Sequence, residues 1–146
     1  MDKGLNSVIH ETFQIEEHDI RTYSPLTLAY IGDGVYDLVV RSIVVGRGNT
    51  APRKLHTRTS RVVNAHAQTQ MMEVLEPVLT EEELSVYRRG RNAKSGTMAK
   101  NATMADYRKA TGFEALVGYL YLCGQGERLM ELLSLGLEKT QGGLLS

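Results

Sequence analysis

The sequence predicts an all-α domain, and three observations lead to this prediction. Apolar residues recur at intervals of three and four along most of the 146-residue chain, which is the spacing of one helix face. Serine, threonine and proline stand where helices would start, and glycines stand where they would end. No linker, repeat or low-complexity run divides the chain, so residues 1–146 are expected to form one domain.

The first half of the chain predicts three helices. One is expected near Leu5–Phe13. A second begins at Ser24-Pro25, because Ser is a favourable N-cap and Pro suits the first turn, and it continues to about Val45. Its β-branched residues lie in phase with the apolar face, which favours helix over strand. A third helix is expected over about 52–75.

The second half predicts three more helices, so about six are expected in all. Thr80 and Glu83 form a capping-box pattern that starts the fourth helix. The glycine-bearing, basic stretch 90–102 is expected to be a loop. A fifth helix should run from about 103 to 124, and a sixth from 126 to about 140, after which the tail should fray.

Composition limits the class of protein. Apolar residues make up 42% and charged residues 23% of the chain, a balance typical of soluble globular proteins. Cys123 is the single cysteine, so no internal disulfide is possible, and a reducing cytoplasm is the expected location. No secretory signal is present at the start of the sequence, and no apolar stretch reaches the ~20 residues of a membrane span.

The charges are unevenly distributed although the net charge is zero. No acid occurs in 41–72, which contains 6 arginines and lysines, and 84–109 contains 7 basic residues against Asp106 alone. Such asymmetry predicts either a basic face for an anionic partner such as nucleic acid or a set of solvated helix faces.

Asp33 is the first candidate site residue. It lies within a mostly apolar helix between Gly32 and Gly34, and a carboxylate there should be half-buried. Each glycine weakens the helix by roughly 1 kcal/mol relative to alanine, which indicates that something must approach closely. Asp33 is therefore a metal-ligand candidate, and the alternative is a buried acid satisfied by a backbone group or an arginine.

Glu114 is the matching candidate. Its neighbours one turn away are Ala110, Thr111 and Gly118, all small, so another helix can come close to this carboxylate. Two carboxylates from crossed helices suit Mg²⁺, which prefers oxygen ligands and keeps several waters. The metal would activate a water and stabilise the leaving oxygen of a phosphodiester. The alternative is a structural carboxylate paired with an arginine.

Two further features surround this pair. Asp37, one turn after Asp33, either supports a metal or pairs with Arg41. Arginines and lysines in the segment that follows the fourth helix suit phosphate contacts, because guanidinium groups offer paired donors. The candidate RNA-binding residues are Arg88, Arg89, Arg91, Lys94 and Lys100.

The residues resemble the ribonuclease III catalytic domain, and in particular its short Mini-III branch. The Gly32-Asp33 pair within 24–36 resembles the family's signature helix. Residues 107–122 resemble its second acidic helix, and 88–94 resemble Mini-III. The resemblance implies an all-α homodimer that cuts double-stranded RNA with Mg²⁺, leaving a 5′-phosphate and a 3′-hydroxyl. It also implies maturation of large-subunit (23S) ribosomal RNA precursor, with a ribosomal protein assisting.

The sequence departs from full-length ribonuclease III in three ways. Ala29 and Thr111 stand where that family has acids, so the resemblance carries catalytic and metal-binding roles over to Asp33 and Glu114 only. A single firmly held Mg²⁺ per subunit is therefore expected. No double-stranded-RNA-binding domain is expected after the last helix, which leaves RNA affinity to the basic residues of the catalytic domain.

Two alternatives belong to other functional classes. The loss of two acids is compatible with a non-catalytic ribonuclease III-like module that binds structured or ribosomal RNA. A metal-dependent nucleotide hydrolase would use the two carboxylates but would leave both basic segments without a role. Cleavage of long double-stranded RNA with Mg²⁺, tested against EDTA, distinguishes the endoribonuclease from both.

Overall fold

A computed structural model describes residues 4–94 and 103–145, and these two ranges contain helices and no strand. The all-α class is therefore confirmed for the described part of the chain. The α-helices are α1 (Leu5–Thr12), α2 (Pro25–Gly46), α3 (Pro52–Ser60), α4 (Ala65–Leu75), α5 (Glu81–Asn92), α6 (Met104–Leu122), α7 (Gly126–Thr140) and α8 (Gly142–Leu145). Two 3₁₀ turns, η1 (Ile20–Thr22) and η2 (Glu76–Val78), lie between them.

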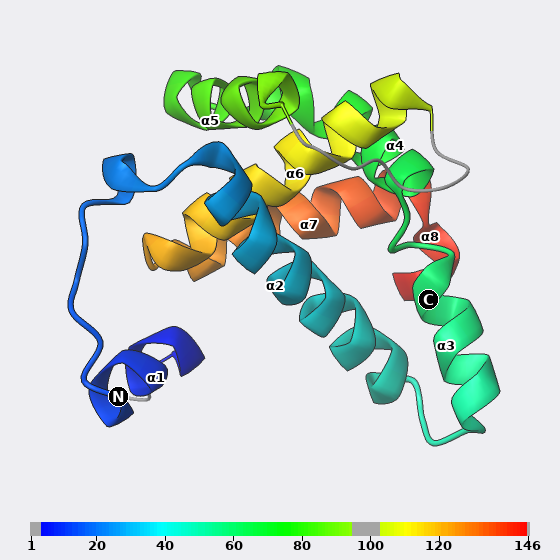
Figure 1. The fold of residues 1–146 in the computed structure, drawn as a ribbon. Helices are drawn as coiled ribbons and strands as arrows, with labels where there is room; N and C mark the ends of the chain where they lie inside the picture. Colours follow the sequence, from blue (N-terminus) through cyan, green and yellow to red (C-terminus); the bar gives the residue numbers. More distant parts are fainter. Residues whose placement is uncertain (1–3, 95–102, 146) are drawn as a thin grey trace.

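Helix α6 is the centre of the bundle. It contacts α2, α4, α5 and α7, and α2 crosses it while α5 and α7 flank it (Figure 1). The fully buried rings of Tyr36 on α2 and Phe113 on α6 meet edge to face, with centroids 4.9 Å apart. Helix α1 has no buried residue and lies apart from the bundle (Figure 1).

Local capping explains the helix starts that the sequence predicts. The Ser24 hydroxyl accepts a hydrogen bond from the Thr27 amide at the start of α2. Thr80 and Glu83 form the expected capping box at the start of α5. Thr103 caps α6 through the Asp106 amide. Each bond satisfies an amide that has no partner within its own helix.

The prediction of one continuous third helix is wrong, because residues 61–64 interrupt the helix between α3 and α4. Asn64 has extended backbone angles, and its side-chain oxygen accepts a hydrogen bond from the Ala67 amide as the N-cap of α4. The side-chain amide of Asn64 also donates to the Ser60 carbonyl at 2.9 Å, which helps close the end of α3. The apolar residues of both helices had suggested one continuous helical face, so the role of Asn64 as an N-cap was not recognised in the sequence.

The boundaries of the predicted basic loop and the frayed tail also differ from the structure. Gly90 lies inside α5, where a Cβ would come within 2.8 Å of the Ala115 Cβ, so the glycine serves close packing on α6. The tail forms the short helix α8, and the Arg47 Nε donates to the Leu144 carbonyl at 3.0 Å. Within the described residues, no helix is long and apolar enough to cross a membrane.

Candidate active site

Asp33 occupies the point where α2 approaches α6 most closely. A Cβ at Gly32 would overlap the backbone carbonyl of Glu114, and a Cβ at Gly118 would overlap that of Leu28. Only glycine allows the two backbones to come this close. Gly34, in contrast, has nothing within 4 Å of its Cβ position. The close approach expected beside Asp33 therefore occurs on the Gly32 side, and the partner is the backbone of α6.

Glu114 is brought against Asp33 by this crossing. Burial raises the pKa of the Glu114 carboxyl to about 9, and a hydrogen bond to Asp33 and the charge of Asp33 act in the same direction. The side chains of Glu114 and Asp33 therefore lie within hydrogen-bonding reach of each other. The structure thus brings the two candidate acids together, as the sequence predicts.

The division of burial between the two acids differs from the prediction. Asp33 was expected to be half-buried, but it is exposed, and the half-buried acid is Glu114. The reason is the position of the two helices, because Glu114 lies on α6, which packs against α2, α4, α5 and α7, whereas Asp33 lies on a part of α2 that is open to solvent. The glycine before Asp33 is therefore explained by the close contact between helices at Gly32, and not by burial of the Asp33 side chain.

Gln68 is a member of the site that the sequence analysis missed. It comes from α4, is only 4% exposed, and its side chain hydrogen-bonds to Glu114, which favours the charged carboxylate and lowers its pKa. A signal was present, because Gln68 is a polar residue in phase with the apolar positions Met71, Met72 and Leu75. Such an amide requires a polar partner inside the protein.

The two positions without acids have no comparable donor. Ala29 is buried and apolar, and the Thr111 hydroxyl donates to the Tyr107 carbonyl of its own helix at 2.9 Å. Among the described residues, no group of three or more histidines, cysteines, aspartates or glutamates could hold a metal ion. Protein ligands from this region would therefore be the carboxylates of Asp33 and Glu114.

This donor set fits Mg²⁺. Two adjacent carboxylates offer hard oxygen ligands, and Mg²⁺ is commonly held by one or two carboxylates with waters and phosphate oxygens completing its shell. Glu114 has no arginine or lysine as an ion-pair partner in the described part of the chain, and its raised pKa reflects that. A divalent cation would offset the repulsion between the two carboxylates, and Glu114 would lose its proton on binding it.

Asp37 forms an ion pair with Arg41, whose Nε lies 2.7 Å from the Asp37 carboxylate. The predicted pairing is therefore present, one turn along α2. Because Arg41 neutralises its charge, Asp37 contributes less to a cation site than Asp33 does.

The candidate RNA-binding residues fall mainly on the last turns of α5. Arg88 and Arg89 are exposed, and the guanidinium of Arg91 lies 5.7 Å from the centroid of the Tyr87 ring. None of these arginines has an ion pair within the described ranges. Lys94 is exposed just beyond α5, and Lys100 lies outside the described residues. Gly90 packs on α6 against Ala115, so the turn of α5 that contains Gly90 lies beside the segment of α6 that bears Glu114.

Comparison with known proteins identifies the class of protein that shares this fold. Residues 26–125 match the family described as "Ribonuclease III domain". A crystal structure of a protein from Fusobacterium nucleatum superposes with a TM-score of 0.76 and 29% identity, covering 84% of this chain and 94% of that one. The match includes both helices that bear the carboxylates.

Curated relatives define the branch within that class. The Mini-ribonuclease 3 of Clostridium tetani is 45% identical, covering 84% of this chain and 82% of its own. That of Brevibacillus brevis is 48% identical over 82% and 89% of the two chains. That of a Thermoanaerobacter species is 41% identical over 94% and 97%. The chain belongs to the ribonuclease III family, in its Mini-ribonuclease 3 branch, and is an endoribonuclease.

Proposed function

We propose that this endoribonuclease is a homodimer that cuts double-stranded RNA with Mg²⁺ bound by Asp33 and Glu114. The observation that carries the proposal is the pairing of these two carboxylates at the α2–α6 crossing, where no described arginine or lysine forms an ion pair with Glu114. The unpaired arginines of α5 supply phosphate contacts beside the pair. A small-molecule hydrolase would have no use for those arginines.

Asp33, Glu114 and Gln68 have different roles in the proposed site. When bound, Mg²⁺ supplies an activated water and stabilises charge on the leaving oxygen of the phosphodiester. Asp33, exposed on α2, reaches the solvent side of the site, and Glu114 holds the inner side. The Gln68 amide orients the Glu114 carboxyl and favours its charged form. The products would be a 5′-phosphate and a 3′-hydroxyl, as the family resemblance implies.

The homodimer is supported by the exposed apolar side chains of α2. Tyr30 is 83% and Leu38 is 52% exposed, and Leu26 is exposed on the same helix, which also bears Asp33. Tyr30 follows Leu26 by four residues and Leu38 follows Tyr30 by eight, with Gly34 between them, so the three side chains form a stripe along one side of α2. A second copy covering that stripe would place the two sites on one face of a symmetric dimer, one for each RNA strand.

The cellular substrate is proposed to be the large-subunit (23S) ribosomal RNA precursor, with a ribosomal protein assisting. The support is membership of the Mini-ribonuclease 3 branch. Exposed, unpaired Cys123 is consistent with the reducing cytoplasm as the location. Double-stranded RNA would be recognised through its backbone and 2′-hydroxyls more than through its bases.

The experiment that tests the proposal is the Asp33→Asn substitution. Cleavage of long double-stranded RNA in Mg²⁺ should fall by about 10³-fold or more, because a metal ligand is lost, whereas the thermal midpoint and RNA affinity in EDTA should change little. Asp37→Asn is the matched control, since it removes the same charge one turn away and should keep most of the cleavage activity.

Metal binding gives an independent measurement. Calorimetric titration with Mg²⁺ should show binding to the unsubstituted protein and to Asp37→Asn protein, and much weaker binding to Asp33→Asn protein. Undiminished cleavage by Asp33→Asn protein would refute the assignment of the site. Equal cleavage by the unsubstituted protein in Mg²⁺ and in EDTA would refute the role of the metal.

A further inference from the structure

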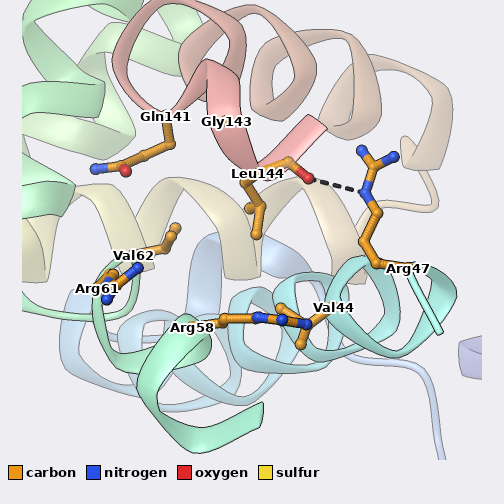
Figure 2. A pocket seen from close by; sticks show the side chains of 8 residues that line it. All are labelled: Val44, Arg47, Arg58, Arg61, Val62, Gln141, Gly143 and Leu144. Carbon is orange, nitrogen blue, oxygen red and sulfur yellow. Dashed lines mark hydrogen bonds between the residues drawn. The ribbon is translucent and has the colours of Figure 1, made fainter. Parts of the chain in front are cut away.

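A second site lies at the opposite end of α2 from the Ser24 cap. A surface pocket of about 570 Å³ opens where the end of α2 meets α3 and the C-terminal segment (Figure 2). Its volume lies within the range of about 300–1,000 Å³ that is typical of ligand pockets. The residues that matter for its chemistry are Val44, Arg47, Arg58, Arg61, Val62 and Leu144. None of them belongs to the site formed by Asp33 and Glu114.

The described residues that line the pocket include three arginines and no acid. The arginines are Arg47, Arg58 and Arg61, and the sequence has no acid between Asp37 and Glu73. In the described part of the chain, neither Arg58 nor Arg61 forms an ion pair. Three like charges around one pocket repel one another, and a bound anion would relieve that repulsion.

The three arginines are also arranged around an apolar surface. The Arg47 Nε donates to the Leu144 carbonyl at 3.0 Å, which holds this side chain at the edge of the pocket (Figure 2). Val44 and Val62 are buried and form the floor, with Leu144 beside them. Guanidinium groups above an apolar floor suit a ligand that joins a phosphate to a less polar group, such as the ribose of a nucleotide.

The position of the pocket relative to Asp33 indicates how such a ligand would reach it. Arg47 follows Asp33 by 14 residues on the same helix and its cap. That separation is close to four turns, so the two residues project from the same side of α2 about 21 Å apart. A nucleic acid lying along α2 would meet both the acidic site and the arginine pocket.

We propose that this pocket binds a backbone phosphate of the RNA, together with its ribose, at a point about four helical turns along α2 from Asp33. The inference rests on the proposed function, because it requires RNA to lie across Asp33 and Glu114. It adds a second point of contact that selects duplexes long enough to span both sites. The arginines of α5 lie beside α6 and constitute a separate contact.

The test measures RNA binding by Arg58→Gln/Arg61→Gln protein in an Asp33→Asn background, so that no cutting occurs. The control is Arg53→Gln/Lys54→Gln, which removes two exposed charges from the same helix α3 without touching the pocket. Affinity for a duplex that spans both sites should fall by roughly tenfold, and the salt slope should become shallower by about 1 to 2. The control pair should change both quantities much less, and Arg58→Lys/Arg61→Lys should keep most of the slope.

Two further arms decide the identity of the ligand. A short duplex that covers only the acidic site should bind the pocket variant and the parent equally. Inorganic phosphate, whose binding is followed by the NMR signals of the arginine Nε groups, should bind far more weakly than the long duplex. The proposal would be overturned if the pocket variant lost equal affinity for both duplexes, or if the control pair lost as much affinity as the pocket variant. It would also be overturned if phosphate saturated the pocket without changing RNA affinity. Absence of RNA binding by the Asp33→Asn parent would instead reject the proposed function, and this inference with it.

Discussion

At the scale of single residues, the half-buried Glu114 and the buried Glu83 show how a partner influences the pKa of a carboxyl group. Glu114 has no cationic partner among the residues that the structure describes, and burial raises its pKa to about 9. Glu83 is only 4% exposed, yet the guanidinium of Arg128 holds its pKa below the ordinary value. The same type of side chain therefore has a raised pKa where it is desolvated beside another acid and a lowered pKa where an arginine pairs with it.

The Glu83 pair is anchored on both oxygens. The Arg128 Nε donates to Oε2 at 2.9 Å, and the Arg128 Nη2 donates to Oε1 at 2.8 Å. The Thr80 amide donates to Oε1 as well, as part of the capping box. Glu83 thus connects the start of α5 to α7.

We predict that Glu83→Gln destabilises the fold by roughly 3 kcal/mol at neutral pH, because a buried ion pair loses one partner. The folded-state pKa of Glu83 lies below its unfolded value, so its contribution is complete above about pH 4.5 and is lost as the pH falls through the lowered pKa. Denaturant unfolding from pH 7 down to pH 3 measures this difference.

Glu131→Gln is the control for Glu83→Gln. Glu131 also pairs with Arg128, at 3.1 Å, but its side chain is 69% exposed. An exposed pair contributes only about 0–1 kcal/mol, so this variant should unfold nearly like the parent protein. A difference between parent and Glu83→Gln that persists unchanged at pH 3 would contradict the role assigned to the Glu83 charge.

At the scale of helices, the crossing of α2 and α6 determines the geometry of the site. Gly32 and Gly118 remove side-chain volume from the contact on opposite helices. A third close contact involves Gly112 of α6, where a Cβ would lie 2.7 Å from the Tyr87 ring of α5. The central helix α6 therefore uses glycines to bring both α2 and α5 close to Glu114.

We predict that Gly32→Ala destabilises the protein by roughly 3 kcal/mol or more, because its Cβ would overlap the Glu114 carbonyl and a backbone must move. Cleavage should fall as well, since the shift separates Asp33 from Glu114. Gly34→Ala is the control on the other side of Asp33. It meets nothing within 4 Å and should stabilise the helix by up to about 1 kcal/mol. Equal unfolding midpoints for the two variants would rule out this account of the crossing.

At the scale of the whole molecule, the chain has zero net charge but an uneven charge distribution. Cations without ion pairs gather in the described parts of α3 and α5, and acids outnumber basic residues in the first 22 residues. A neutral protein can thus present a basic surface to a polyanion while avoiding strong self-repulsion. The candidate RNA contacts on α5 and in the arginine pocket both belong to this distribution.

We predict that Arg88→Ala/Arg91→Ala weakens binding to double-stranded RNA and makes its salt dependence shallower by about 1 to 2 in slope, because fewer counterions are released. Titrations between 50 and 200 mM salt in EDTA measure this effect, and the thermal midpoint checks folding. The Arg53→Gln/Lys54→Gln pair again serves as the control. A salt slope equal to that of the parent would remove these arginines from the RNA contact.

The sequence by itself determined most helix boundaries and both candidate acids. The caps at Ser24, Thr80 and Thr103 are hydrogen bonds between residues three positions apart, so their pattern is visible in the chain. Asp33 and Glu114 stood out because each is an acid in an apolar helix with small neighbours. These features depend on local geometry, which repeats in every helix.

Only the tertiary structure decided what those residues meet. The burial of Glu114, the amide of Gln68 beside it and the packing of Gly90 on α6 each depend on how separate helices cross. The arginine pocket likewise joins Arg47, at the end of α2, to residues of α3 and the C-terminal segment. Helix periodicity specifies a face but not its partner, because the partner depends on packing between residues far apart in the chain.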